Sequence, residues 1–284
     1  MDLFNSRSHL TGFHGVSAAC VNLVVLILTL LTHATIGCGG RRVEVTPNTA
    51  DADILLFDLG QEALADDDWT RAREYFIQIR DNYPQSTLRA DARLGAAESY
   101  EGEATPASYV SALSELRDFL SLYPTHERAG YAQYKLGMVF FNQMRRPERD
   151  QSETREAVRE FETFIQSYAA TAENELLNEV RAKLREARDQ LSESSFIVGR
   201  FYYRNKFYSG AISRFEEILD NDPGYTGRDA VYFHLADSLA INERDAEALP
   251  IFERLVDEFP ETEYHERATE HIARLKIAMN INDR

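Results

Sequence analysis

Apolar residues recur at helical spacing from about residue 52 onwards, and short polar turns interrupt them at intervals. Five of these turns align with one another: NYPQS, LYPTH, SYAAT, NDPGY and EFPET end at residues 86, 126, 171, 225 and 262. Twelve positions before the third residue of each turn stands an alanine, and eight positions before it stands a phenylalanine or leucine. The alanines are Ala72, Ala112, Ala157, Ala211 and Ala248, and the larger residues are Phe76, Leu116, Phe161, Phe215 and Phe252. Five matches at fixed offsets indicate an internal repeat.

A second helical run precedes each of these segments and carries a small residue. The marking pairs are Leu59-Gly60, Leu94-Gly95, Leu136-Gly137, Val198-Gly199 and Leu235-Ala236. Small residues let two helix backbones approach, a large side chain fills the space beside them, and proline ends the second helix. This arrangement resembles the tetratricopeptide repeat. In repeats two and three the small residue and the repeat alanine are 17 and 20 positions apart, against 12 elsewhere, so we expect extended loops there.

Two further helices complete the predicted architecture. Between residues 171 and 190 there is no glycine or proline, and apolar residues recur at helical spacing. Residues 173 to about 204 are therefore predicted to form one long helix. Residues 264–279 predict a last helix without a partner, as expected of a capping helix. The predicted fold is therefore all-α, an α-solenoid of five tetratricopeptide-like helix pairs plus a C-terminal capping helix. We assign 52–171 to repeats one to three, and 172–284 to the long helix, repeats four and five and the capping helix.

The first 51 residues have a different pattern. Residues 21–32, VNLVVLILTLLT, form an apolar run of signal-peptide length that is too short to span a membrane. The stretch from Thr35 to Cys38 resembles the lipobox of bacterial lipoproteins, which implies that Cys38 is lipid-modified and anchors the chain to a membrane. Residues 1–37 are then a lipoprotein signal peptide, and residues 38–51 a flexible tether. The alternative is an ordinary signal peptide, or an uncleaved anchor, with an incidental Cys38.

Composition narrows the possible chemistry. The net charge of −16 disfavours nucleic acid as a partner. Two cysteines without metal-ligand spacing, and the absence of phosphate-loop, GxSxG and HExxH motifs, lead us to expect no cofactor, no metal, no catalytic residue and no enzyme. Helix capping is the preferred interpretation of ADDDW at residues 65–69, and we expect His265 and His271 at the surface.

Three longer segments carry a more specific resemblance. YAQYKLGMVFFNQM at 131–144, RDQSETREAVREFETFIQSY at 149–168 and SFIVGRFYYRNKFYSGAISRFEEIL at 195–219 are similar to the BamD family of outer-membrane β-barrel assembly lipoproteins. The resemblance implies a periplasmic scaffold on the inner leaflet of the outer membrane. Its implied partners are the barrel subunit of the assembly machinery, accessory lipoproteins and unfolded outer-membrane protein clients. Two alternatives stay open: another tetratricopeptide lipoprotein, such as a pilotin or a Tol-associated cell-division coordinator, and a cell-wall enzyme.

The tetratricopeptide pattern directs one face of each first helix towards an inner groove. The positions on that face are Ile54, Phe57 and Gln61 in repeat one, Tyr131, Tyr134, Met138 and Phe141 in repeat three, and Phe196, Arg200, Tyr203 and Arg204 in repeat four. Aromatic and arginine side chains suit an extended peptide that ends in an aromatic residue and a carboxylate. The alternative is that the rings simply pack between helices. The resemblance places client recognition in the first half, which favours Phe57 and Tyr134.

Arg214 is a candidate for a different surface. It adjoins Phe215, so it lies about 100° around the helix from that ring and should point away from the groove. One interpretation is a solvated arginine paired with Glu216 or Glu217. The other is implied by the resemblance: an arginine that contacts the periplasmic domains of the barrel subunit.

Overall fold

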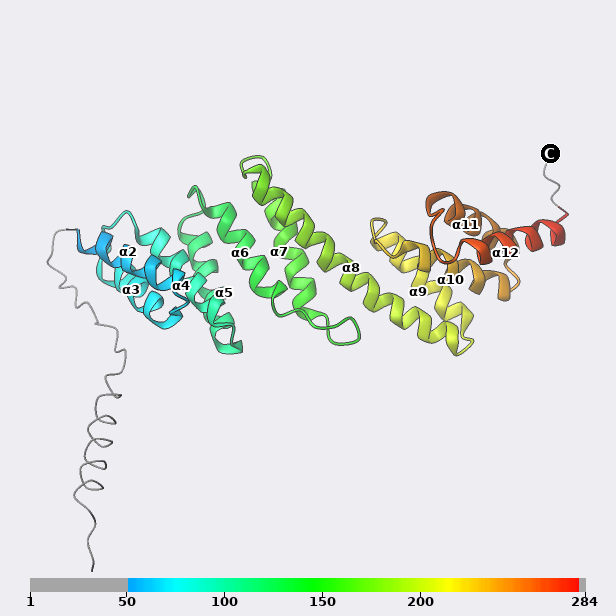
Figure 1. Ribbon diagram of the computed structural model, residues 1–284, viewed down its shortest axis with the longest axis horizontal. Coiled ribbons are helices and arrows are strands. Elements are labelled where there is room, and N and C mark those ends of the chain that lie inside the picture. The colour runs from blue at the N-terminus through cyan, green and yellow to red at the C-terminus, as the bar shows by residue number, and fades with distance from the viewer. Residues whose placement is uncertain (1–50, 281–284) are drawn as a thin grey trace, which may run out of the picture. The chain divides into compact units, whose positions relative to one another are not determined.

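A computed structural model describes residues 51–280 of the chain, and within them it contains eleven α-helices and no β-strand (Figure 1). Residues 1–50, including the predicted leader, Cys38 and nearly all of the tether, lie outside the described residues. The helices are α2 (Ala52–Ala65), α3 (Trp69–Asn82), α4 (Arg89–Glu103), α5 (Pro106–Leu122), α6 (Ala129–Phe141), α7 (Ser152–Tyr168), α8 (Asn174–Arg204), α9 (Tyr208–Asn221), α10 (Arg228–Ile241), α11 (Asp245–Glu258) and α12 (His265–Ala278).

The helices form consecutive pairs, α2 with α3 through α10 with α11, and each helix also packs against the next one along the chain. The last helix, α12, packs on α11. The predicted α-solenoid of five tetratricopeptide-like pairs and a capping helix is therefore confirmed. Among residues 51–280, none of the helices has the length and hydropathy required to cross a bilayer.

Small residues meet large ones where the helices cross. Gly60 in α2 and Gly95 in α4 both face the ring of Phe76, and a Cβ on them would lie 2.7 Å and 2.6 Å from it. Gly137 faces Phe161 in the same way, at 2.5 Å. The five repeat alanines and the five larger residues of the pattern are each at most 1% exposed. The repeat pattern thus marks the crossing points of the helices.

Helix boundaries follow the turn chemistry. Asp68 precedes α3, and its carboxylate accepts a hydrogen bond from the backbone N–H of Arg71, which confirms the capping interpretation of residues 65–69. Thr105 and Ser108 form a reciprocal capping box at the start of α5, with Pro106 in its first turn.

The expected loop in repeat two is absent. Only residues 104 and 105 separate α4 from α5, and the extra residues instead lengthen these helices to 15 and 17 residues. Ala104 makes the tight turn possible by adopting the left-handed conformation, at φ 52°. In repeat three an extended loop does connect α6 to α7, from Asn142 to Gln151.

The long helix α8 belongs to two apolar cores. Near its start, Leu177 and Val180 pack with Phe161 and Phe164 of repeat three. Near its end, Phe196 packs with the residues of repeats four and five. The predicted long helix is confirmed, while a boundary between two domains at residue 171 stays a prediction.

Candidate functional site

The predicted groove residues all lie on first helices of their pairs, namely α2, α6 and α8. They differ in how far solvent reaches them. Exposed residues are Ile54, Gln61, Arg200 and Arg204; partly buried ones are Phe57, Tyr131, Met138, Phe141 and Tyr203; and buried ones are Tyr134 and Phe196, at 8% and 5% exposure. The exposed and partly buried members can touch a ligand directly, whereas Tyr134 and Phe196 support them from within.

In repeat three, aromatic rings surround the crossing of α6 and α7. The ring centroids of Tyr134 and Phe141 lie 6.5 Å and 6.1 Å from that of Phe161, and Tyr131 lies 6.2 Å from Tyr134. The Tyr134 hydroxyl donates a 2.5 Å hydrogen bond to Glu179 of α8. Burial and this bond raise the pKa of Tyr134, so the hydroxyl stays protonated at neutral pH. This cluster fixes α6 to α8.

Tyr131 borders a hollow of about 670 Å³ between the start of α6 and the α7–α8 connection, which Arg128, Tyr168 and Leu176 also line. The guanidinium of Arg128 lies 4.9 Å from the Tyr131 ring centroid. The same guanidinium pairs with Asp91 and, at 3.5 Å, with Glu98. This hollow could not be predicted from the sequence, because its walls come from two segments, residues 124–131 and 167–176, that are 36 positions apart at their nearest.

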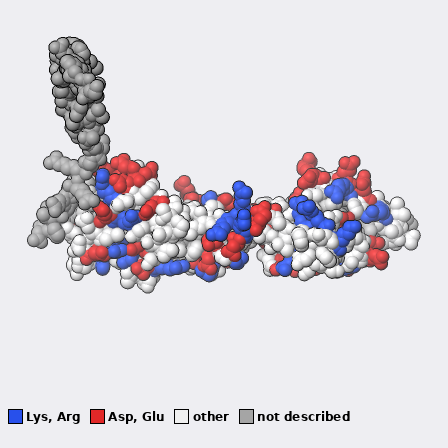
Figure 2. All heavy atoms as spheres, turned by 90° about the horizontal axis from the view of Figure 1, so that it is seen from below, with Lys and Arg blue, Asp and Glu red and all other residues white. Residues whose placement is uncertain are grey.

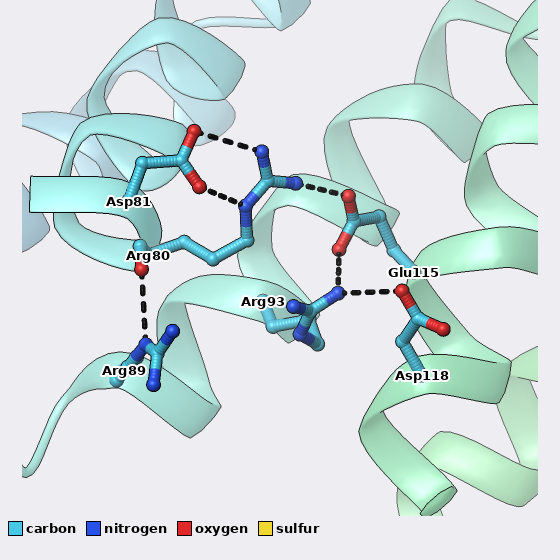
Figure 3. Close-up of polar contacts among 6 residues, drawn as sticks. All are labelled: Arg80, Asp81, Arg89, Arg93, Glu115 and Asp118. Atoms are coloured by element: carbon cyan, nitrogen blue, oxygen red, sulfur yellow. Dashed lines mark hydrogen bonds and ion pairs between the residues drawn. The ribbon is translucent and has the colours of Figure 1, made fainter. Parts of the chain in front are cut away.

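In the first pair, Phe57 packs edge-on against Phe76 at a centroid distance of 5.6 Å. A network of ion pairs lies elsewhere in the first two repeats, and it joins α3, α4 and α5 (Figure 3). Glu115 accepts hydrogen bonds from both Arg80 and Arg93, and Arg93 also reaches Asp118 at 3.1 Å. Burial raises the pKa of Glu115, although both guanidinium groups oppose the rise. This network holds α3, α4 and α5 together.

The second half has a polar cluster that the sequence analysis missed. Asp237 of α10, 7% exposed, accepts a 2.5 Å hydrogen bond from the hydroxyl of Tyr203 in α8. The Nε2 atom of His271 in α12 lies 3.6 Å from the other carboxylate oxygen. The expectation of a surface His271 is wrong, since its side chain is only 20% exposed and stacks on Phe252. These contacts join α8, α10 and α12.

Arg214 lies on α9, away from the core. Its side chain is 46% exposed and its Nη1 atom donates a 2.8 Å hydrogen bond to Glu217. The neighbouring Phe215 is fully buried. Arg214 therefore points to solvent, and its position relative to the groove stays a prediction. An exposed pair of this kind contributes well under about 1 kcal/mol.

Within the described part of the chain, no group of three or more His, Cys, Asp or Glu side chains is placed to hold a metal ion. The candidate positions for binding are therefore the first-helix residues described above, the hollow beside Tyr131 and the exposed Arg214 on α9.

Comparison with known proteins gives a consistent result. The model of a family described as outer membrane lipoprotein, YfiO, matches residues 49–244. The outer membrane protein assembly factor BamD of Caulobacter vibrioides is 26% identical over 226 residues, which cover 78% of this chain and 72% of that protein. The protein of the same name from Rickettsia prowazekii is 28% identical over 184 residues, covering 64% and 71%.

Among solved structures, the TPR2AB-domain:pHSP90 complex of yeast Sti1 is similar at a TM-score of 0.43 and 13% identity, covering 80% of this chain and 84% of that one. The P58(IPK) TPR domain is similar at a TM-score of 0.38 and 15% identity, covering 81% and 57%.

Proposed function

Because the chain belongs to the YfiO family of outer membrane lipoproteins, we propose that it is a scaffold subunit of the machinery that assembles outer-membrane β-barrel proteins. The observation that carries the proposal is the family match over residues 49–244, which includes the inner face of repeats one to four and Arg214. The relatives named above favour this function over a pilotin, a Tol-associated coordinator or a cell-wall enzyme. The proposed partners are the barrel subunit, accessory lipoproteins and unfolded clients.

The proposed location is the periplasmic face of the outer membrane, with Cys38 as the lipid-modified anchor. Two or more acyl chains hold a protein firmly on a membrane, since each buried CH₂ group contributes about 0.8 kcal/mol. Intact-mass analysis of the membrane-extracted protein should find a chain that begins at Cys38 and carries the added mass of acyl groups. An unmodified Cys38 in that material would contradict the anchor.

The proposed contact with the barrel subunit includes Arg214. A guanidinium can form forked hydrogen bonds with a partner carboxylate, and such a bond is stronger and more directional than the exposed pair with Glu217. We expect Arg214→Glu to weaken binding to the isolated periplasmic domains of the barrel subunit by about 2 kcal/mol. Titration of the full chain measures the affinity, and thermal melting checks the fold.

Arg159→Glu is the matched control for Arg214→Glu. Arg159 is also an exposed arginine on the second helix of its pair, and it also pairs with a glutamate three positions away. Its substitution should leave the affinity unchanged. If both variants and the wild type bound the periplasmic domains with equal affinity, Arg214 would not belong to the contact with the barrel subunit.

The proposed client surface is the inner face of the first half. We expect Phe57→Ala together with Tyr134→Ala to weaken binding of a peptide from the C-terminus of a barrel protein by about tenfold. Since Tyr134 is buried, Tyr134→Phe serves as a control that keeps the ring and loses only the bond to Glu179. Unchanged affinity in a folded double variant would exclude these two residues from the client surface.

A further inference from the structure

We propose that Arg200 and Arg267 form a carboxylate-binding site on the inner face of the second half, for an extended peptide segment that carries two acidic side chains. The proposal deepens the proposed function, on which it rests, by stating the chemistry of the ligand that this part of the inner face takes. It also adds Arg267, a residue that the sequence analysis did not single out.

The two arginines come from different helices, and each lies over a ring that packs against the same residue of α10. Arg200 belongs to α8, and its guanidinium lies 5.7 Å from the ring centroid of Phe196. Arg267 belongs to α12, and its guanidinium lies 4.2 Å from the ring centroid of Phe233. Both rings pack against His234 of α10, with centroid distances of 5.5 Å and 5.6 Å. The two guanidinium groups therefore lie over a floor of buried rings, Phe196 of α8 and Phe233 of α10, which both contact His234.

The helices that carry the arginines are held in fixed positions. Tyr203 of α8 and His271 of α12 both contact the carboxylate of Asp237, about one helical turn beyond His234 on α10. This carboxylate is buried and accepts a hydrogen bond from Tyr203. The nearby acidic side chain thus serves to join the helices and leaves both arginines without a carboxylate partner.

The lack of partners sets these arginines apart from most others in the chain. Both are exposed, and neither forms a hydrogen bond or ion pair with any residue between 51 and 280. Arg185 by contrast pairs with two carboxylates. In a chain with 47 acidic and 31 basic residues, free arginines that converge on one site are unexpected. Several basic side chains are visible over the C-terminal part of the body in Figure 2.

Stacking on a ring prepares an arginine for a carboxylate. The flat guanidinium lies over the aromatic face, and its N–H groups remain free at the edges to form forked hydrogen bonds. Burial lowers the pKa of His234, and the charges of Arg200 and Arg267 lower it further. The positive charge of the site at neutral pH therefore comes from the two arginines, and the floor between them is neutral and aromatic.

The position of the site favours a peptide over a membrane surface. The arginines belong to α8 and α12, and the charges of both act on His234 of α10, so a ligand that binds both must extend across three helices. An extended chain with an apolar residue between two acidic ones can place a carboxylate at each guanidinium. In the first half, by contrast, the rings of Tyr131 and Tyr134 lie near Glu101, an environment that disfavours acidic ligands.

Fluorescence polarisation with the full chain in detergent tests the proposal. The probe is a labelled peptide of about ten residues with one phenylalanine between two glutamates, and its twin carries glutamines in their place. We expect the twin to bind about tenfold more weakly, and Arg200→Gln and Arg267→Gln each to weaken the acidic probe about fivefold. Arg200→Lys keeps the charge but loses the forked geometry, and should give an intermediate loss.

Arg181→Gln is the matched control, because Arg181 is also an exposed arginine of α8 with no bonded partner among the described residues. It should change the affinity less than twofold. Equal binding of probe and twin, or an equal loss in Arg181→Gln and Arg200→Gln, would overturn the proposal. The proposal would also be overturned if the chain bound phosphatidylglycerol vesicles through Arg200 and did not bind the peptide. The assay contains no assembly partner. If the chain did not co-purify with the assembly machinery, the proposed function would fail, and the peptide-binding result would still hold.

Discussion

The guanidinium of Arg185, in the long helix α8, forms two hydrogen bonds with the carboxylate of Asp222, the residue directly after α9. The Oγ atom of Ser192 donates a third hydrogen bond to the same carboxylate at 2.8 Å. Asp222 is 8% exposed. Helix α8 is therefore fixed to the end of α9 by one buried carboxylate.

We expect Asp222→Asn to lower the free energy of unfolding at pH 7 by about 2 kcal/mol, because the buried ends of Arg185 and Ser192 lose their charged acceptor. Urea unfolding measures this difference. Glu217→Gln is the control, since its pair with Arg214 is exposed and its loss should cost less than about 0.5 kcal/mol.

The same substitution has a predictable dependence on pH. Burial alone would raise the pKa of Asp222, but the bonds from Arg185 and Ser192 outweigh it and hold the pKa below the usual 3.8. A carboxylate with a depressed pKa stabilises the fold above its unfolded pKa, and this stabilisation is lost as the pH falls through the folded value. The difference between wild type and Asp222→Asn should thus shrink below about pH 3.8. A difference that stayed constant down to pH 2.5 would contradict this account.

The repeat architecture could be predicted because its signals are local. Gly199 and Phe215, for example, are 16 positions apart in one helix pair, and the same small and large residues recur in the other pairs. Asp237 and His271 could not be found in this way, because their contacts join three helices and no spacing rule links them. The loop in repeat two was mispredicted for a related reason: extra residues between two crossing points can lengthen the helices as well as the loop.

The crossing of α8 and α9 requires glycine at position 199. A Cβ at this position would lie 2.5 Å from the ring of Phe215, which is fully buried and cannot move aside. We expect Gly199→Ala to lower the free energy of unfolding by about 1–3 kcal/mol, despite the better helix propensity of alanine. Gly130→Ala is the control, since its Cβ would lie 3.4 Å from Tyr168 and should be neutral or stabilising. Equal effects of the two substitutions in thermal melting would exclude the steric explanation.

Gln151 organises the loop of repeat three. Its side chain is 5% exposed, and its amide nitrogen donates to the backbone carbonyls of Arg145, Arg146 and Arg149 at 3.4, 2.8 and 3.1 Å. Its amide oxygen accepts a hydrogen bond from Thr154. One buried amide thus determines the conformation of residues 145–151.

We expect Gln151→Ala to make this loop a substrate for limited trypsin digestion, with cleavage after Arg145 and Arg149 about tenfold faster than in the wild type. Arg146 should resist cleavage in both proteins, because Pro147 follows it. Mass spectrometry of the early fragments locates the cuts. Gln143→Ala provides a comparison, since that amide donates only to the carbonyl of Val139 in the preceding helix α6. Faster cleavage spread over the whole chain would instead indicate global destabilisation.

Glu115 is the centre of the ion-pair network that joins α3, α4 and α5. Its side chain and that of Arg93 are each 11% exposed, and Arg93 donates a 2.6 Å hydrogen bond to it. The Nε atom of Arg93 has no partner among the described residues, so the arginine depends strongly on its carboxylates. We expect Glu115→Ala to lower the free energy of unfolding by about 3 kcal/mol, because it leaves Arg93 buried with only the exposed Asp118 as a partner.

Two further variants distinguish the cost of leaving Arg93 unpaired from the cost of the packing lost in Glu115→Ala. Replacing both residues, Glu115→Leu with Arg93→Leu, removes the unpaired charge and should recover about half or more of the lost stability, since apolar pairs often substitute for buried ion pairs without loss. Asp118→Ala should cost less than about 1 kcal/mol, because that side chain is 58% exposed. If the double variant were as unstable as the sum of its single substitutions, the cost would lie in lost packing, and Glu115 would not act through the charge of Arg93.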